Sequence, residues 1–340
     1  MVGLRTQFVH LYVKDNTEES GVKFEDYGIY TQVEQLNKTA LKSHGLDSNG
    51  QLYKINSFEF YRYEDIIKKE DDAGYDKTAF EKMLEIKGDS DHTKLIDMLT
   101  DLNDYSIGIE DVLKEHFDEE NIVYWMAFQI LMGNVDTQNR NVYLYSPLNS
   151  DIWYFIAWDN DGCLMRPEYE LRNFSDQNSW EKGISNYWGN ILFQRCLKSR
   201  SFREKLNDAI LDLREYLLIS KIESYKNVLK PYLYLMPDAE YEPLTSEQYD
   251  QIAASLPDEI EKNYQLYLES LETPMPFYIG VPTIDGDKLK FNWDVSYDLD
   301  AEDITYSVEV ARDYLFQDVI YQNTTLTVPE AEMDLPNAGQ

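Results

Sequence analysis

Apolar and polar residues alternate in short runs over the first part of the chain, and this pattern predicts β-strands. RTQFVHLYV (5–13) and YGIYTQVEQ (27–35) predict two partner strands separated by a charged loop. NKTALKSHGL (37–46) predicts a short helix after them, and the aromatic-rich QLYKINSFEFYRY (51–63) predicts a further strand or hairpin. The chain therefore opens with a small β-rich region.

The spacing of apolar residues then changes to that of helices. Residues 64–118 are acidic and permit helix, most clearly in HTKLIDMLTDLND (92–104), where the apolar residues fall on or near one face. EENIVYWMAFQILMGN (119–134) is apolar nearly all round, which predicts a central buried helix. Two glutamates in its first turn suit the positive end of the helix dipole.

A hairpin and a second helical region follow, and then the pattern changes again. VYLYSP (142–147) and IWYFIAW (152–158) predict two strands joined by a turn. Residues 185–272 are mostly helical in pattern. Two prolines in TPMPF (273–277) precede short alternating runs such as KLKFNW (288–293), which predict a separate β-sandwich.

Composition and charge narrow the class of protein. The chain has 340 residues, enough for about two domains with real cores, and 43 % of them are hydrophobic, which excludes wholesale disorder. The 63 acidic and 31 basic residues give a formal net charge of −32. Such an excess argues against nucleic acid and anionic membranes as partners. Two interpretations stay open, which are solubility in a salty or extracellular setting and a basic partner.

Several kinds of site and segment are not expected. Cys163 and Cys196 form no CxxC pair, so neither a disulfide framework nor a zinc site is predicted. The four histidines form no HExxH motif. No apolar run reaches the roughly eighteen residues of a membrane span, and the first residues lack the pattern of a signal peptide.

The candidate chemistry lies in two polar stretches beside apolar elements. GNVDTQNRNVYLY (133–145) places Asp136 and Asn141 just past the predicted buried helix, and WDNDG places Asp159 and Asp161 just past the predicted hairpin. In kinases an aspartate orients and deprotonates the acceptor hydroxyl, while an asparagine five residues later and an aspartate after the next hairpin bind Mg²⁺. Mg²⁺ takes hard oxygen ligands, and the base must be a carboxylate. The order of helix, loop, hairpin and carboxylates predicts a phosphoryl-transfer site.

Simpler interpretations exist for each motif taken alone. An aspartate followed five residues later by an asparagine is common by chance, and amide-rich turns often satisfy backbone groups. WDNDG could instead be a calcium-type loop, but an EF-hand pattern needs Asp or Asn where Ala157 stands. No glycine-rich GxGxxG or GxxxxGK[ST] loop occurs in the chain.

The motifs together resemble a known family, the CotH kinases related to the spore coat protein H kinase. The resemblance rests on YGIYTQVEQ, GQLYK (50–54), GNVDTQNRNVYLY and WYFIAWDNDG (153–162), and covers roughly residues 5–270. It implies an atypical protein-kinase-like fold that uses ATP with Mg²⁺ or Mn²⁺ to phosphorylate a protein.

The resemblance also implies roles for individual residues. Asp136 corresponds to the catalytic base, and Asn141 and Asp159 to metal ligands, with Asp161 as an alternative or supporting ligand. YGIYTQVEQ corresponds to the strand that runs into the hinge, which places Glu34 with Asn141 among the expected cofactor-binding residues. The alternative for this segment is an ordinary interior strand with Glu34 on the surface.

Two departures from the family pattern are expected. The strands that carry the phosphate loop and its lysine would lie upstream of Met1, and the nearest substitutes within the chain are Lys54 and Lys42. At the other end, residues 273–340 resemble a partial fibronectin type III or immunoglobulin-like sandwich, with Trp293 in its core. An acidic turn in this part, DLDAED, is either a calcium site or a solvated loop.

These observations lead to one fold prediction and competing functions. The predicted fold is α+β, with a kinase-like domain of mainly helical C-lobe and partial β N-lobe over residues 1–272, followed by the partial sandwich.

The first functional hypothesis is a Ser/Thr protein kinase acting on a secreted or surface protein, for which a spore coat is one setting. The second is a catalytically weak, kinase-like binding or adhesion module. A carbohydrate-binding protein is a third, although the many aromatic residues are more simply core. The acidic 64–118 region would suit a Lys- or Arg-rich acceptor, or it is a solvated face.

Overall fold

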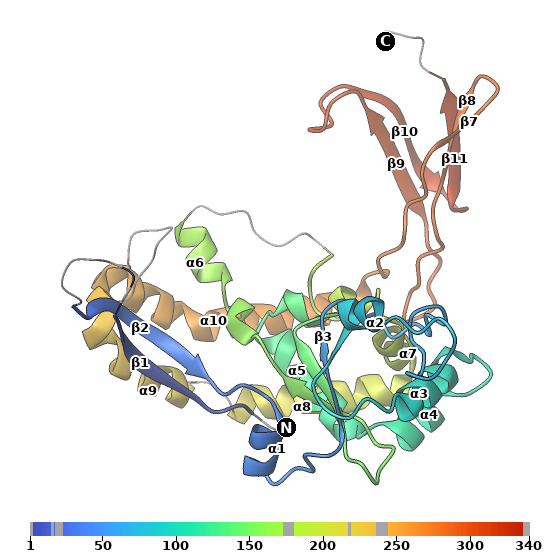
Figure 1. Ribbon diagram of the computed structural model, residues 1–340. Helices are drawn as coiled ribbons and strands as arrows, with labels where there is room; N and C mark the ends of the chain where they lie inside the picture. Colours follow the sequence, from blue (N-terminus) through green and yellow to red (C-terminus); the bar gives the residue numbers. More distant parts are fainter. Residues whose placement is uncertain are drawn as a thin grey trace.

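The computed structural model describes residues 3–14, 17, 23–172, 180–216, 219–235 and 244–335. Helices and strands are mixed along the chain, so the α+β class is confirmed. A helical body holds a small sheet against one side, a long hairpin extends from it, and the last strands project away from it (Figure 1). Within the described residues, every helix is too short or too polar to span a lipid bilayer.

The bounds of the elements are as follows. The α-helices are α1 Lys38–Ser43, α2 Lys77–Met83, α3 Thr93–Asn103, α4 Ile109–His116, α5 Glu119–Leu131, α6 Arg166–Leu171, α7 Ile191–Lys198, α8 Arg200–Tyr216, α9 Ile219–Leu229 and α10 Ser246–Glu272. Short 3₁₀ helices are η1 Val135–Thr137, η2 Asn160–Gly162, η3 Ser185–Tyr187 and η4 Lys230–Leu235. The strands are β1 Thr6–Val13, β2 Glu25–Val33, β3 Gln51–Ile55, β4 Leu84–Ile86, β5 Val142–Ser146, β6 Tyr154–Ala157, β7 Thr283–Asp285, β8 Lys288–Asn292, β9 Tyr306–Ala311, β10 Val319–Leu326 and β11 Glu330–Asp334.

The sheet of the helical body has four antiparallel strands in the order β4-β3-β5-β6. Alternate residues of these strands face the main core, where Tyr53, Leu144 and Phe155 are buried. The opposite face carries a second, smaller core in which Tyr143 and Ile156 pack with residues of and beside α1. Lys54 pairs with Tyr143 across the strands, so its side chain lies on this second face.

Helix α5 is the central helix that the sequence predicts. Asp118 caps its first turn by accepting a hydrogen bond from the backbone N–H of Asn121. Trp125 is fully buried and stacks on Phe193, with ring centroids 5.5 Å apart. Tyr124, by contrast, is only half-buried, because its hydroxyl reaches the surface and donates to Asp212.

One predicted strand is shorter than the pattern indicates. β3 ends at Ile55, and residues 56–63 form a loop although Phe58 and Phe60 are fully buried. Phe60 and Tyr63 have positive φ angles of 63° and 39°, which an extended strand does not allow. The run of aromatic residues therefore predicted a strand, whereas in the structure these rings reach the core from a loop.

Strands β1 and β2 form a two-stranded antiparallel hairpin, as predicted. Much of its apolar surface is uncovered, since Phe8 is 42 % exposed and Tyr12 is 51 % exposed. The hairpin joins the body at its base, where Glu34 accepts hydrogen bonds from the backbone N–H of Arg5 and the hydroxyl of Ser43.

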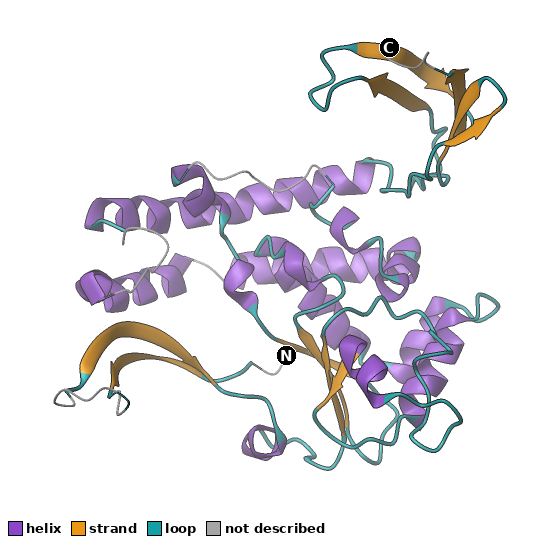
Figure 2. Cartoon of the chain, turned by 45° about the horizontal axis from the view of Figure 1, so that its top comes forward, coloured by secondary structure: helices purple, strands orange, loops and turns teal. Residues whose placement is uncertain are grey.

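After α10 the described part of the chain contains only strands (Figure 2). They form a two-stranded sheet, β9-β10, and a three-stranded sheet, β7-β8-β11. The rings of Phe291 and Tyr321 stack between the two sheets, and Trp293 packs edge-on against Tyr306. The division of the chain at residue 272 and the partial sandwich remain predictions.

Candidate active site

The loop that follows α5 turns sharply at Gly133. Its φ of +61° lies in the left-handed region, and a Cβ there would come within 2.7 Å of the Asn263 side-chain nitrogen. Asn263 needs that space, because its Nδ2 donates a 3.0 Å hydrogen bond to the carbonyl of Leu131 at the end of α5. Glycine thus allows α10 to cap α5 at the point where the loop begins.

Three amide side chains join this loop to the segment after β6. The Nδ2 of the buried Asn134 donates to Gln129 Oε1 at 3.0 Å and to Asn160 Oδ1 at 3.3 Å. Gln129 Nε2 also donates to Asn160 Oδ1, at 3.1 Å. We call Gln129, Asn134 and Asn160 the amide cluster. It holds the Asp136 loop and the Asp159–Asp161 loop side by side, because separating them would break both bonds to Asn160 and leave the buried Nε2 of Gln129 without this acceptor.

Other elements hold the remaining backbone of the loop. Its carbonyls accept side-chain hydrogen bonds from Asn186 (to Val135, 3.1 Å) and Asn190 (to Gln138, 2.8 Å), and a backbone one from Phe58 (to Asn139, 2.8 Å). Residues of two distant segments of the chain thus hold the loop.

Asp136 sits in the short helix η1 with a half-exposed side chain. One carboxylate oxygen accepts from the guanidinium of Arg140, and the other accepts from Asn141 Nδ2 at 2.8 Å. The amide nitrogen of Asn141 is used in this way, and its amide oxygen takes no part in this hydrogen bond. The carboxylate is therefore oriented from within its own loop.

Asn141 and Asp159 share an unusual backbone conformation. Their φ angles are +58° and +57°, in the left-handed region that Asn and Asp tolerate better than most residues. Val142 pairs with Ala157 in the β5–β6 ladder, so the two residues emerge from the same end of the sheet. Such backbone strain is characteristic of functional sites, where the surroundings hold it in place.

The electrostatics of Asp159 reflect a concentration of negative charge. Partial burial raises its pKa above the ordinary value, and the carboxylates of Asp161 and Asp136 raise it further. Lys54 opposes this rise, and its ammonium lies 5.6 Å from the ring centre of Trp158, the residue before Asp159. The three aspartates that the sequence singled out are therefore close enough to affect one another.

A cavity of about 460 Å³ opens beside these groups. Asp136, Arg140 and Asp161 contribute to its lining. Across from them lies the ion pair between Arg166 and Glu259, with 2.8 Å between nitrogen and oxygen. The cavity has room for a ligand of the size of a nucleotide phosphate tail and an acceptor side chain.

A family model described as CotH kinase protein matches residues 1–267, well over half of the 340-residue chain. The chain belongs to the CotH kinase family. No curated protein matches the chain. The resemblance drawn from the four motifs is thus confirmed, and the matched region contains the loop, the amide cluster and all three aspartates of this CotH family member.

The side chains present fit a divalent cation of the kind that CotH kinases are expected to use. Among the described residues, no group of three or more His, Cys, Asp or Glu side chains could hold a metal ion by itself. Asp159 and Asp161 supply two neighbouring carboxylates, and Asn141, at the same end of the sheet, has an amide oxygen of the same hard-donor kind. Mg²⁺ is commonly held by one or two carboxylates, with substrate phosphates and water completing its shell. The mutual repulsion at Asp159 is what a bound cation would relieve.

Glu34 is not brought together with these residues. Its carboxylate accepts hydrogen bonds from the Arg5 backbone N–H and from the His44 ring, which is 2.7 Å away. These two hydrogen bonds lower the pKa of Glu34, and the bond from His44 has the larger effect. None of the contacts described for Glu34 involves Asp136, Asn141 or Asp159. Its role in cofactor binding remains a prediction.

Sequence reasoning missed the residues that build the site rather than the residues that react. Gln129 lies within the apolar helix run, and Asn134 and Asn160 lie inside the two quoted motifs, yet none was assigned a role. Amides placed at buried positions of a helix and its adjoining loop are the signal that could have found them.

Proposed function

We propose that the protein is an ATP-dependent kinase that phosphorylates a hydroxyl side chain of a protein. The observation that carries this proposal is the amide cluster, which holds the loop of Asp136 and Asn141 against the loop of Asp159 and Asp161. Family membership supports it. The acceptor we propose is Ser or Thr of a secreted or surface protein, with a spore coat as one setting.

Asp136 is the group that would orient the acceptor hydroxyl and take its proton. Its side chain is 42 % exposed and lines the cavity, so an acceptor can reach it. Arg140 and Asn141 fix its two oxygens, which limits the carboxylate to one orientation. A positioned general base of this kind contributes about 10²–10⁴-fold to a rate.

Asn141, Asp159 and Asp161 would hold Mg²⁺ or Mn²⁺, and the metal nucleotide supplies the transferred phosphoryl group and neutralises its charge. Lys54 adds a positive charge near Asp159 on the same side of the sheet. It is the candidate within this chain for contact with the nucleotide phosphates. A bound metal ion would offset the excess of carboxylates over cations at this point.

The second candidate function is a kinase-like binding module with weak catalysis. The ion pair of Arg140 with Asp136 favours it, because an acceptor hydroxyl must compete with a guanidinium for the carboxylate. Transfer activity decides between the two functions.

The test uses two substitutions that separate base from ligand. Asp136→Asn keeps the shape of the side chain but removes the carboxylate, so the rate of radiolabelled phosphate transfer to a generic protein acceptor should fall about 10²–10⁴-fold with nucleotide affinity nearly unchanged. Asp159→Asn should weaken binding of Mg²⁺ with a nucleotide analogue as well as the rate. Asp65→Asn, which changes an exposed aspartate outside the site, is the control. Full transfer activity in Asp136→Asn would reject the base, and no transfer by the unmodified chain would favour the binding module.

A further inference from the structure

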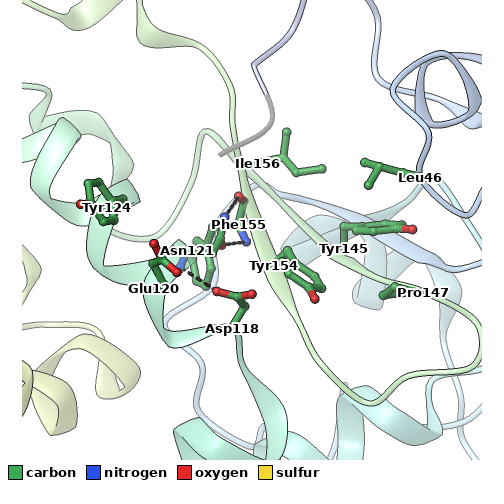
Figure 3. Close-up of a pocket in the computed structure, with 10 residues that line it drawn as sticks. All are labelled: Leu46, Asp118, Glu120, Asn121, Tyr124, Tyr145, Pro147, Tyr154, Phe155 and Ile156. Carbon is green, nitrogen blue, oxygen red and sulfur yellow. Dashed lines mark hydrogen bonds between the residues drawn. The ribbon is translucent and has the colours of Figure 1, made fainter. Parts of the chain in front are cut away.

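A second cavity lies at the opposite end of α5 from the proposed catalytic loop. Its volume is about 640 Å³, larger than that of the cavity beside Asp136. It is lined by Leu46, Asp118, Glu120, Asn121, Tyr124, Tyr145, Pro147, Tyr154, Phe155 and Ile156. Figure 3 shows the acidic residues and Tyr124 along the start of α5, with Tyr145 and Pro147 across from them. We call this cavity the helix-start pocket.

The charge of the helix-start pocket is negative. None of the ten residues that line it is basic, and within the described part of the chain no cationic side chain pairs with Asp118 or Glu120. The neighbouring Glu119 does have such a partner, Lys205 at 2.6 Å. The start of a helix carries only about half a positive charge, so two unpaired carboxylates outweigh it.

Aromatic rings supply the rest of the pocket's chemistry. Tyr154 and Tyr145 line the pocket from adjacent strands, with ring centroids 6.3 Å apart, and Tyr154 is the more exposed of the two. Asp118 lies near Tyr154 in the pocket (Figure 3), and its charge adds to burial in raising the pKa of Tyr154. Carboxylates beside tyrosine rings attract a cation through both Coulomb and cation–π interactions. The apolar walls, which include Leu46 and Pro147, suit the methylene stem of a lysine or an apolar neighbour.

Strand addition is not the mode of recognition here. Asn121 donates to the carbonyl of Phe155 at 3.1 Å and accepts from its backbone N–H at 2.6 Å. This side chain therefore occupies the outward hydrogen-bonding groups of Phe155, at the middle of the edge strand β6, that a visiting strand would use. At this position a peptide is held through its side chains.

We propose that the helix-start pocket binds a short lysine- or arginine-containing segment of the protein substrate. That the peptide belongs to a protein substrate rests on the proposed kinase function. Binding of a basic peptide in the pocket does not itself require catalysis. Met132 follows Glu120 by twelve steps along α5, a distance of about 18 Å at 1.5 Å per residue. An extended peptide needs about five or six residues for that distance. Because α5 is largely buried and a peptide must pass around it, the basic segment is expected at least about six residues from the phosphorylated residue.

A binding experiment on the full chain tests the pocket directly. The probe is a fluorescein-labelled six-residue peptide with three lysines and one leucine, and its twin has every lysine acetylated. The lysine peptide should bind and the acetylated one should not. The double variant Asp118→Asn/Glu120→Gln should raise the Kd about tenfold, and Asn at position 118 still caps α5. Glu64→Gln/Asp65→Asn removes two exposed carboxylates elsewhere and should stay within twofold.

The outcomes separate this inference from the proposed function. Equal loss of binding in the two double variants would show that only the overall charge matters, and would reject binding in the pocket. Equal binding by the unmodified chain and both double variants would reject it as well. In a transfer assay with serine six residues from the lysines, Asp118→Asn/Glu120→Gln should raise KM about tenfold with kcat nearly unchanged. Asp136→Asn should leave peptide binding intact. Pocket-dependent binding without any transfer would support the pocket and reject the kinase.

Discussion

The loop of residues 133–141 and the β1–β2 hairpin are held to the same body in opposite ways. The loop is fixed by the amide cluster and by hydrogen bonds from several elements, and Asn134 at its start is only 2 % exposed. The hairpin leaves Tyr12 and Tyr30 half-exposed, and the hydrogen bonds at its base run from Glu34 and Arg5 to His44 and Ser43.

This difference shows where stability and proposed chemistry are coupled. Substitutions of the residues that hydrogen-bond the loop should destabilise the core and disturb the candidate site together, because the same buried groups hold both in place. Changes to the exposed positions of the hairpin should have little effect on the free energy of unfolding, since most of its side chains are already in contact with water. Four predictions test this contrast.

The largest expected effect comes from the helix on which the loop stands. Trp125→Ala removes a fully buried ring that stacks on Phe193, and should lower the free energy of unfolding by about 3–5 kcal/mol. Tyr30→Ala in the hairpin should change it by about 0.5 kcal/mol or less. Urea unfolding followed by fluorescence and circular dichroism measures both. Similar losses from the two substitutions would end the contrast.

The amide cluster should couple stability to activity. Asn134→Ala leaves Gln129 without a donor and frees the loop from Asn160, so about 1–3 kcal/mol of stability should be lost. Under the proposed function, the phosphate-transfer rate should also fall about 10–100-fold, because small displacements of catalytic groups are costly. Asn49→Ala, at an exposed position, is the control. Loss of stability with unchanged rate would show that the cluster is structural only.

The turn after α5 should be more sensitive than a similar glycine near the hairpin. Gly133→Ala places a Cβ against Asn263 and strains a left-handed backbone, which should cost about 1–3 kcal/mol. Gly45 also has a positive φ, +74°, but nothing lies within 4 Å of the position its Cβ would take. Gly45→Ala should therefore cost only the backbone strain, about 1 kcal/mol. Thermal unfolding of both variants gives the comparison, and a larger effect at position 45 would contradict it.

The smallest effect is expected at the base of the hairpin, as a dependence on pH. The folded state lowers the pKa of Glu34 below its ordinary value of 4.5, chiefly through the hydrogen bond from His44. Its contribution to stability is thus present above pH 4.5 and is lost as the pH falls through the lowered pKa. Unfolding midpoints measured from about pH 6 to about pH 3 should drop less steeply in Glu34→Gln than in the unmodified chain. Glu25→Gln, an exposed glutamate in the same hairpin, should keep the original slope; a matching change there would remove Glu34 as the cause.

The sequence predicted the elements whose pattern is local. The buried helix, the β5–β6 hairpin and the β1–β2 pair follow from short runs of apolar residues, and the structure confirms all three. The proximity of Asp136 and Asp159 follows from the same order of elements, because a helix end and a strand end meet at one edge of the sheet. Their chemical roles remain predictions.

What depends on distant parts of the chain was not predictable. Asn263 caps α5 from 132 residues away in the sequence, and Asn190 holds the carbonyl of Gln138 from 52 residues away. No local pattern marks such a partner. Whether residues 56–63 form a strand or a loop depends similarly on the core against which they pack, since buried aromatic residues suit both. The helix-start pocket likewise needs two elements that adjoin only in the folded chain.

The hydrogen bonds between Asn121 and Phe155 also bear on how copies of this protein behave at high concentration. An open edge strand is a template on which another molecule can extend the sheet, and this is a common route to aggregation. By filling the outward donor and acceptor of Phe155, one amide side chain blocks that route at the middle of β6. Negative charge adds repulsion between molecules, since the chain carries a formal −32. The fold thus makes it harder for a second molecule to extend the four-stranded sheet at β6.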